Sequence, residues 1–245
     1  MSSRGLIFVA AIFLQTGIYC QNQVQYEKVF HVEYSNALGF LSQNTWIADS
    51  ISSENINPNF AVSIVFPEIL RYSALKNVIE ASALKTLYIQ YGSKYSDFSI
   101  GYFQMKPSFA EKLEIVWNKF FIKNPNNKSA RFDTDNSITS RKERIKRLDN
   151  IYWQVKYLCM FIKFLDLRHS KLIFADECEK LKFYATAYNY SFSANSKTIK
   201  SQINKTFFHT DFVQTNSTKF YSYSDISVYF FSNDGSAIFV GNDFK

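Results

Sequence analysis

One carboxyl group in this sequence lies within an apolar stretch at helical spacing. In AVSIVFPEILRYSALKNVI, residues three or four apart share one face of a helix. That face carries Val65, Glu68, Tyr72, Leu75 and Ile79. Apolar surroundings raise the pKa of a carboxyl and keep it protonated near neutral pH. Glu68 is therefore a candidate general acid for cleaving a glycosidic bond. Pro67 followed by Glu68 is also an ordinary helix start, so a purely structural role stays open.

The stretch SDFSIGYFQMKPSFAEKLE, from Ser96 to Glu114, contains a second candidate segment. Its second half predicts an amphipathic helix, because Ser108 and Glu111 form a capping-box pair just after Pro107. Apolar residues then recur at helical spacing: Phe109, Leu113, Val116, Trp117, Phe120 and Phe121. The first half, GYFQM, supplies a glycine, two aromatic rings and an uncharged amide. Such an amide can donate and accept hydrogen bonds to the hydroxyl and N-acetyl groups of a sugar.

A third segment, ATAYNYS, runs from Ala185 to Ser191. In this order, the three segments resemble the soluble lytic transglycosylases of the lysozyme-like superfamily. That family has a catalytic glutamate at a helix end, a GLMQ-type turn before a helix beginning P-S/T-x-A, and an AYN helix. The resemblance covers residues 60 to 192. It implies a lysozyme-like helical domain that cleaves the β-1,4 bond between MurNAc and GlcNAc in peptidoglycan glycan strands.

The resemblance also implies roles for single residues. Glu68 stands for the catalytic glutamate, and the Tyr188 hydroxyl is expected near its carboxyl, which it would orient. Gly101 would allow a tight turn, while Gln104 points its amide into the sugar cleft. Tyr102 and Asn189 would bind substrate beside them. No cofactor and no metal is implied, and the few scattered His and Cys residues do not have metal-site spacing.

The sequence departs from the family pattern in three places. Ile69 follows Glu68 where the family usually has serine, the gaps between the segments are longer, and Tyr190 replaces a glycine after AYN. A catalytically inactive lysozyme-fold protein that binds the cell wall or acts as a scaffold is therefore one alternative. A two-carboxylate muramidase is another, with Asp97 as the possible second carboxylate. Asp97 also suits a loop residue or a helix cap. A lytic transglycosylase needs only one carboxylate, because the 6-hydroxyl of the sugar attacks the anomeric carbon.

The composition of the chain predicts a mostly α fold with a sizeable core. Aromatic residues make up 18% of the 245 residues, which excludes a disordered chain. With only 7 Gly and 4 Pro, a turn-rich all-β fold is also excluded. The lysozyme-like domain is expected over residues 58–192, after an N-terminal helical extension over residues 21–57. Residues 193–245 are expected to form a small irregular or β-containing segment that packs on this domain.

Periodicity places further elements along the chain. Residues 60–92 predict two helices, and buried helices are expected from 148 to 167 and from 174 onward. Residues 123–147 are polar and basic, which predicts a long exposed loop or a basic helix end. The alternation in FYSYSDISVYFF predicts one or two strands or an aromatic wrapping segment.

The first 20 residues have the pattern of an export signal. One positive charge in MSSR precedes the apolar GLIFVAAIFLQTGIY, and the polar QNQVQYEK follows. This run and every later one are too short for a membrane span. We therefore expect an exported protein of the bacterial periplasm or cell envelope, with no integral membrane span after signal removal. The bulky Tyr19 argues against lipid attachment at Cys20, and a eukaryotic glycan on the NYS sequon at Asn189 would fill the expected cleft.

The net charge and the cysteine content limit which partners and which cysteine chemistry can be expected. Removal of Arg4 with the signal lowers the formal charge from +7 to +6, which suits a polyanionic cell wall. Nucleic acid is not expected as a partner, because the chain has no basic-aromatic motif. Export permits a disulfide between Cys159 and Cys178. Two buried thiols are the alternative, since Cys159 lies in an apolar helical run.

Overall fold

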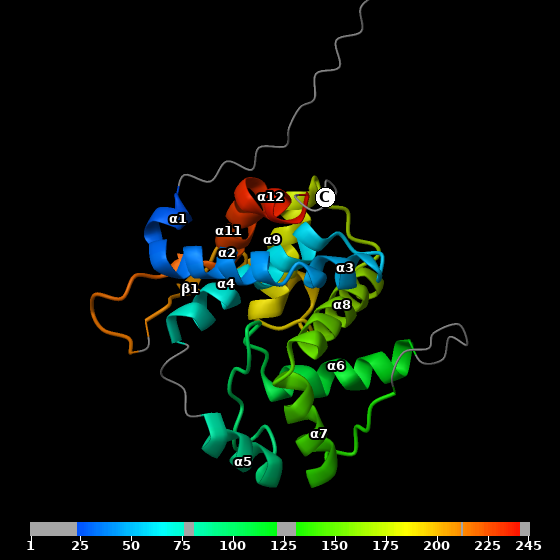
Figure 1. Cartoon of the computed structure of the whole chain (residues 1–245). Helices are drawn as coiled ribbons and strands as arrows, with labels where there is room; N and C mark the ends of the chain where they lie inside the picture. Colours follow the sequence, from blue (N-terminus) through cyan, green and yellow to red (C-terminus); the bar gives the residue numbers. More distant parts are fainter. Residues whose placement is uncertain (1–23, 76–80, 122–130, 212, 241–245) are drawn as a thin grey trace, which may run out of the picture.

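The computed structural model describes residues 24–75, 81–121, 131–211 and 213–240, and Figure 1 shows their arrangement. Helices dominate these residues, and the sheet they contain is a two-stranded antiparallel one near the C-terminus. The prediction of a mostly α fold with a small irregular C-terminal segment is thus confirmed. The expectations for the export signal and for Cys20 lie outside the described residues.

The elements follow one another along the chain with these bounds. They are α1 (Tyr26–Val29), α2 (His31–Gln43), α3 (Trp46–Ser52), α4 (Pro58–Leu75), α5 (Ala81–Tyr91), α6 (Pro107–Phe120), α7 (Ile138–Leu148), α8 (Ile151–Arg168), α9 (Glu177–Asn189), α10 (Ser196–Gln202), β1 (Thr206–Phe208), β2 (Tyr221–Ser222), α11 (Tyr223–Phe230), a π-helical turn (Phe231–Gly235) and α12 (Ser236–Val240).

Helix α4 is the central element of the core. It packs against α2 and α3 on one side and against α9 and α11 on another (Figure 1). The residues from Ala61 to Val65 are almost entirely apolar and fully buried, as are Phe66, Ile69 and Leu70. A helix that is apolar all round must be enclosed by other elements. Pro67 lies inside α4, so the interpretation of Pro67 and Glu68 as a helix start is wrong.

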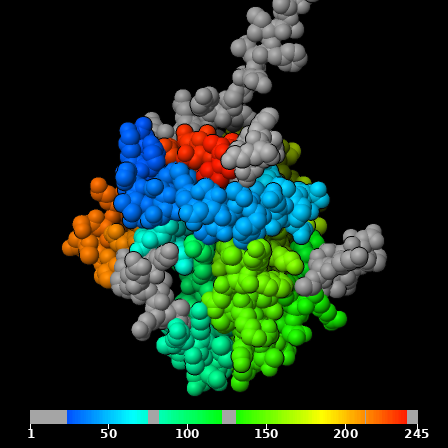
Figure 2. Space-filling model, in the orientation of Figure 1, coloured from blue at the N-terminus to red at the C-terminus, as the bar shows by residue number. Residues whose placement is uncertain are grey.

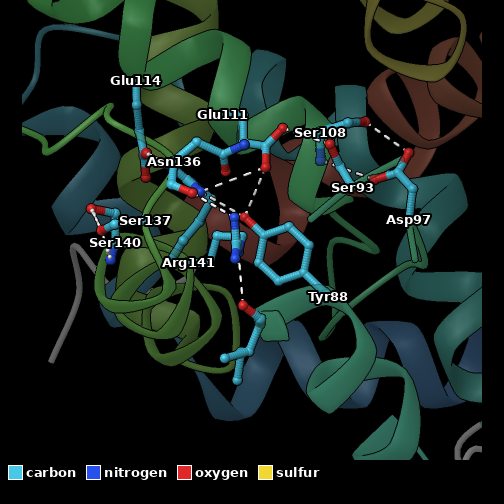
Figure 3. Close-up of polar contacts among 12 residues, drawn as sticks. Tyr88, Ser93, Asp97, Ser108, Glu111, Glu114, Asn136, Ser137, Ser140 and Arg141 are labelled. Carbon is cyan, nitrogen blue, oxygen red and sulfur yellow. Dashed lines mark hydrogen bonds and ion pairs between the residues drawn. The ribbon is translucent and has the colours of Figure 1, made fainter. Parts of the chain in front are cut away.

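Helices α5, α6 and α7 form the lower part of the molecule in Figure 1 and join through a polar network. Figure 3 shows Tyr88 of α5 donating a hydrogen bond to Glu111 of α6 at 3.0 Å, and Ser93 donating to the same carboxylate at 2.7 Å. Arg144 of α7 donates to the Tyr88 hydroxyl at 2.6 Å. The α5–α7 region is therefore held by directional polar bonds as well as by apolar packing.

Glu114 of α6 is the centre of this network and is fully buried. Its carboxylate forms ion pairs with Arg144 at 2.7 Å and with Arg147 at 2.9 Å, and it accepts a hydrogen bond from the Tyr157 hydroxyl of α8. The prediction of a loop or a basic helix end over residues 123–147 is only partly right, because α7 forms from residue 138. Arg144 within it is buried rather than exposed.

Asp97 fixes the start of α6. One of its carboxylate oxygens accepts a hydrogen bond from the Ser108 N–H at 2.9 Å, and the other accepts from the Ser108 hydroxyl at 2.7 Å (Figure 3). The predicted capping box of Ser108 and Glu111 is wrong, since Lys106 occupies the cap position and Glu111 bonds to α5 and the loop after it. Asp97 therefore stabilises the first turn of α6 from the preceding loop, which matches the capping role that the sequence analysis left open for it.

The aromatic segment FYSYSDISVYFF is mostly helical. Only Tyr221 and Ser222 form a strand, β2, and Tyr223–Phe230 form α11. The expectation of one or two strands over this segment is therefore largely wrong. The Ser222 hydroxyl caps α11 by accepting from the Asp225 N–H at 3.2 Å. The segment around β1 projects at one side of the molecule, as the orange atoms in Figure 2 show.

The two ends of the described chain meet in one core. The Tyr34 hydroxyl of α2 donates to Asp234 at 2.6 Å, and Tyr229 of α11 donates to Glu27 of α1. The Tyr26 and Tyr229 rings also meet edge to face, with centroids 5.4 Å apart. The blue and red segments accordingly lie side by side in Figures 1 and 2.

The two cysteines that were open to pairing do not bond to each other. Cys159 is a free, buried thiol in α8. Cys178 is disulfide-bonded. The alternative of a thiol in an apolar helix therefore holds for Cys159 and fails for Cys178.

Candidate functional site

A cavity of about 290 Å³ opens between α4, the GYFQM turn, the start of α6 and the end of α9. This volume is close to the lower end of the range for small-molecule sites, about 300 Å³. Three of the predicted site segments contribute to its wall, although the sequence separates them by up to 120 residues. The lining residues used below are Glu68, Arg71, Asp97, Gln104, Lys106, Lys112, Tyr188 and Asn189.

Glu68 is the buried carboxyl of this cavity, with 5% of its surface exposed. The expectation that it ends its helix is wrong, because α4 continues to Leu75. Burial raises the pKa of Glu68 above its ordinary value, while the charges of Arg71 and Lys106 lower it by less. The result is a carboxyl that holds its proton to higher pH than an exposed glutamate would.

Arg71, one helical turn after Glu68, is the direct partner of that carboxyl. Its Nη1 lies 2.9 Å from the Glu68 Oε2. Its guanidinium carbon stands 4.6 Å from the centre of the Phe208 ring, and its Nε donates to the His209 carbonyl at 3.4 Å. The C-terminal segment therefore holds Arg71 in place beside the candidate acid.

The GYFQM segment forms a closed turn between two bridged residues. The Ile100 N–H donates to the Met105 carbonyl at 3.0 Å, and the Met105 N–H donates back at 3.1 Å. Two residues within the turn have positive φ, Gly101 at 69° and Gln104 at 47°. Phe103 is fully buried between them. The turn thus places the Gln104 side chain in the cavity wall and Phe103 in the core.

The Gln154 side chain of α8 links this turn to the residues before α8 through two hydrogen bonds. Its Oε1 accepts from the Phe103 N–H at 2.9 Å, and its Nε2 donates to the Leu148 carbonyl at 2.7 Å. A Cβ built on Gly101 would lie 1.6 Å from the Gln154 Nε2. Position 101 therefore requires glycine for two reasons, the positive φ and the close approach of Gln154.

We expect Gly101→Ala to destabilise the protein by about 2–5 kcal/mol. Positive φ alone costs about 1–2 kcal/mol for a residue with a Cβ. The added methyl also displaces Gln154, which leaves the buried Phe103 N–H without its acceptor, a loss of about 1–3 kcal/mol. Urea denaturation followed by circular dichroism measures the change. Gly39→Ala is the matched control, because a Cβ at Gly39 meets no atom within 4 Å. Equal stability of the two variants would contradict this account of the turn.

Tyr188 of α9 lies in the cavity wall next to Glu68, but its hydroxyl has another partner. The hydroxyl donates to the Phe103 carbonyl at 2.7 Å. Burial raises the pKa of Tyr188 well above its usual range, and the charge of Glu68 raises it further. The structure therefore brings the two side chains to one site, while the hydrogen bond of Tyr188 orients the turn rather than the Glu68 carboxyl.

Of the remaining predicted residues, Gln104, Asn189 and Asp97 line the cavity, whereas Tyr102 and Gly101, which the structure also describes, are not among its lining residues. Gln104 and Asn189 line the cavity, although the Gln104 Nε2 donates to the Gly101 carbonyl at 2.7 Å. Tyr102 is not among the described residues that line it, and its ring stacks on Phe40 with centroids 3.8 Å apart. Gly101 acts through the backbone of the turn. Asp97 lines the cavity with both carboxylate oxygens bonded to Ser108.

Sequence reasoning missed several residues of the site. Arg71 stands three residues after Glu68, and that spacing is a signal for an ion pair on one helix face. Lys106 and Lys112 stand on either side of the predicted helix start, so the sequence already indicated two cations near the turn. Gln154 and Phe208 are far from the other site segments in sequence, and nothing in their local patterns points to the site.

Comparison of the chain with protein-family models, with curated proteins and with solved structures gives no match. Among the described residues, no group of three or more His, Cys, Asp or Glu side chains could hold a metal ion. No helix in the described part of the chain combines the length and apolar character needed to cross a membrane.

Proposed function

We propose that this protein is a peptidoglycan lytic transglycosylase that cleaves the β-1,4 bond between MurNAc and GlcNAc with Glu68 as its one catalytic carboxylate. The observation that carries the proposal is the buried Glu68 carboxyl, whose pKa burial raises, in the wall of a 290 Å³ cavity. Gln104 and Asn189 stand in the same wall and supply amide groups for sugar hydroxyls and N-acetyl groups.

One carboxyl suffices for this reaction. Glu68 donates its proton to the glycosidic oxygen as the bond from that oxygen to the anomeric carbon breaks. The resulting carboxylate is stabilised by Arg71, 2.9 Å away. It then accepts the proton of the 6-hydroxyl of the same sugar while that oxygen bonds to the anomeric carbon. Because the nucleophile already belongs to the bound sugar, most of the entropy cost of capturing it is met on binding.

The geometry of Asp97 argues against the two-carboxylate muramidase. A second carboxylate must be free to activate water or to attack the sugar. Both oxygens of Asp97 are engaged by Ser108 at the start of α6. The role of helix cap accounts for Asp97 without a catalytic one.

One observation favours the second candidate, an inactive protein that binds the cell wall. The Glu68 carboxyl is already in an ion pair with Arg71, as it would be in a purely structural role. The two candidates differ in whether any glycan product forms, so a digestion experiment separates them.

The proposed reaction predicts a specific product. Purified peptidoglycan incubated with the protein should release muropeptides that end in 1,6-anhydro-MurNAc, lighter by one water than products of hydrolysis. Mass spectrometry of the digest measures this, with a lysozyme digest of the same material as reference. Products with free reducing ends would indicate a muramidase. Binding to peptidoglycan without any product would establish the inactive wall-binding protein instead.

The ion pair with Arg71 predicts a change in pH dependence. Arg71→Met removes a charge that lowers the pKa of Glu68 while the burial that raises this pKa remains. The pKa of Glu68 should rise further. Because a general acid must be protonated, the alkaline limb of the profile of kcat/KM against pH should move to higher pH. Lys119→Met, on the part of α6 away from the cavity, should leave the profile unchanged. An alkaline limb that stays in place would mean that Glu68 is not the titrating acid.

A further inference from the structure

In the described part of the cavity wall, cationic side chains outnumber carboxyl groups by three to two. Three cationic side chains line it, Arg71, Lys106 and Lys112. Arg71 is paired with Glu68, and the second carboxylate of the wall, Asp97, is engaged by Ser108. Among the described residues, no ion pair is formed by Lys106 or by Lys112. Two ammonium groups at the site are thus available to a ligand.

Both lysines line the cavity and stand at the start of α6. Lys106 occupies the cap position before α6, and Lys112 follows in the same helix. Six residues of helix correspond to about 9 Å along the axis, a span that two long lysine side chains can bridge to one anionic group. The charge of Lys106 also reaches Glu68, since it lowers the pKa of that carboxyl. A ligand bound at the lysines therefore lies next to the candidate acid.

We propose that Lys106 and Lys112 form a carboxylate-binding subsite beside Glu68, which selects glycans with acidic groups over neutral ones. This inference rests on the proposed function, because it assigns the substrate class of the same cavity. Lysine ammonium groups recognise a carboxylate as compact point charges and do not require a fixed orientation of its plane. A neutral chitooligosaccharide offers the same rings and N-acetyl groups but leaves both charges unpaired.

Carboxylates of peptidoglycan come from two sources: the stem peptide, and the lactyl group of any MurNAc that carries no stem, because a stem is joined to the lactyl carboxyl by an amide bond. Removing the stem peptides with an amidase leaves the lactyl carboxylate as the acidic group of the strand. Three ligands therefore separate the possibilities: a chitooligosaccharide, peptide-free strands and strands that keep their stems. Loss of affinity for peptide-free strands would identify the lactyl group, and a loss confined to stem-bearing strands would identify the peptide.

The test measures binding in a background without turnover, using Glu68→Gln protein and isothermal titration calorimetry. Lys106→Gln and Lys112→Gln should each weaken binding of acidic strands about fivefold, and the double variant about tenfold or more. Binding of the chitooligosaccharide should not change. Lys119→Gln, an exposed lysine on the same helix away from the cavity, is the matched control.

Equal losses for neutral and acidic ligands, no loss for either, or no binding of any ligand would overturn the subsite. The proposed function fails by a different measurement, the absence of cleavage by the wild-type protein. A wild-type protein that shows no cleavage, but whose lysine variants lose affinity for the acidic strands alone, would retain the subsite and exclude the enzyme.

Discussion

Glu68→Gln is expected to lower the rate of peptidoglycan cleavage at least about a hundredfold and to leave the fold intact, because general acid–base groups contribute about 10²–10⁴-fold. Glutamine has the shape of glutamate, and its amide oxygen can still accept the hydrogen bond from Arg71, which the carboxylate accepts at 2.9 Å. It has no proton to give to the glycosidic oxygen. Release of soluble muropeptides from purified peptidoglycan measures the rate, and circular dichroism checks the fold.

Asp97→Asn is the matched control for this experiment. The amide oxygen of asparagine can still accept a hydrogen bond from the Ser108 N–H, so the start of α6 should persist. The cleavage rate should change little if Glu68 is the one catalytic carboxylate. Digestion by Glu68→Gln at the wild-type rate would exclude Glu68 as the acid. A large loss of cleavage rate in Asp97→Asn with an intact fold would support the two-carboxylate mechanism instead.

Glu114→Gln should lower the free energy of unfolding by about 3–5 kcal/mol, the usual cost of breaking a buried ion pair by removing one partner. Arg144 has 1% of its surface exposed and would keep its charge in the core. The other carboxylate near it, Glu111, lies 3.6 Å away and already accepts from Tyr88 and Ser93. The loss should therefore be only partly compensated. Urea denaturation monitored by tryptophan fluorescence measures it.

Glu143→Gln provides the matched comparison in α7. Its ion pair with Lys146, at 2.6 Å, lies on the exposed surface, where solvent screens the charges. Stability should barely change in this variant. If Glu114→Gln were as mild, the buried network would not be what joins α5, α6, α7 and α8.

Helices with strong apolar periodicity were predictable from the sequence. Residues 60–92 gave two helices, and the predicted helix after Pro107 begins at that residue. The ends of such helices can be predicted where the capping residue is adjacent to the helix in sequence. The cap of α6 was missed because Asp97 stands 11 residues before Ser108, beyond the range of a local capping motif.

The error in the aromatic segment has a physical explanation. Its alternating aromatics suggested a strand, yet Tyr223, Ile226, Ser227 and Phe230 are buried at a spacing of three and four. Ser222 and Asp225 are also three residues apart, as in a helix start. A large aromatic content favours strands in isolation, but here the apolar surfaces of α4 and α9 select the helix.

The candidate site was predictable only in part, because its partners are distant in sequence. The apolar stripe pointed to Glu68 and the family resemblance to Gln104 and Asn189, and the structure places all three in one cavity wall. The hydrogen bond of Tyr188 could not be read from its motif, since its acceptor is a backbone carbonyl 85 residues away. The same holds for Arg144, whose burial depends on a glutamate 30 residues earlier.

The meeting of the two chain ends has a consequence for biosynthesis. Helix α4 is covered by α11, which the ribosome makes only after α5 to α10. Tyr34 likewise finds Asp234 only after 200 further residues have been added. The part of the α4 surface that α11 covers therefore stays exposed while the elements between them are made. Domains whose contacts are local can fold from the N-terminus as they emerge, whereas this core closes only once α11 has left the ribosome.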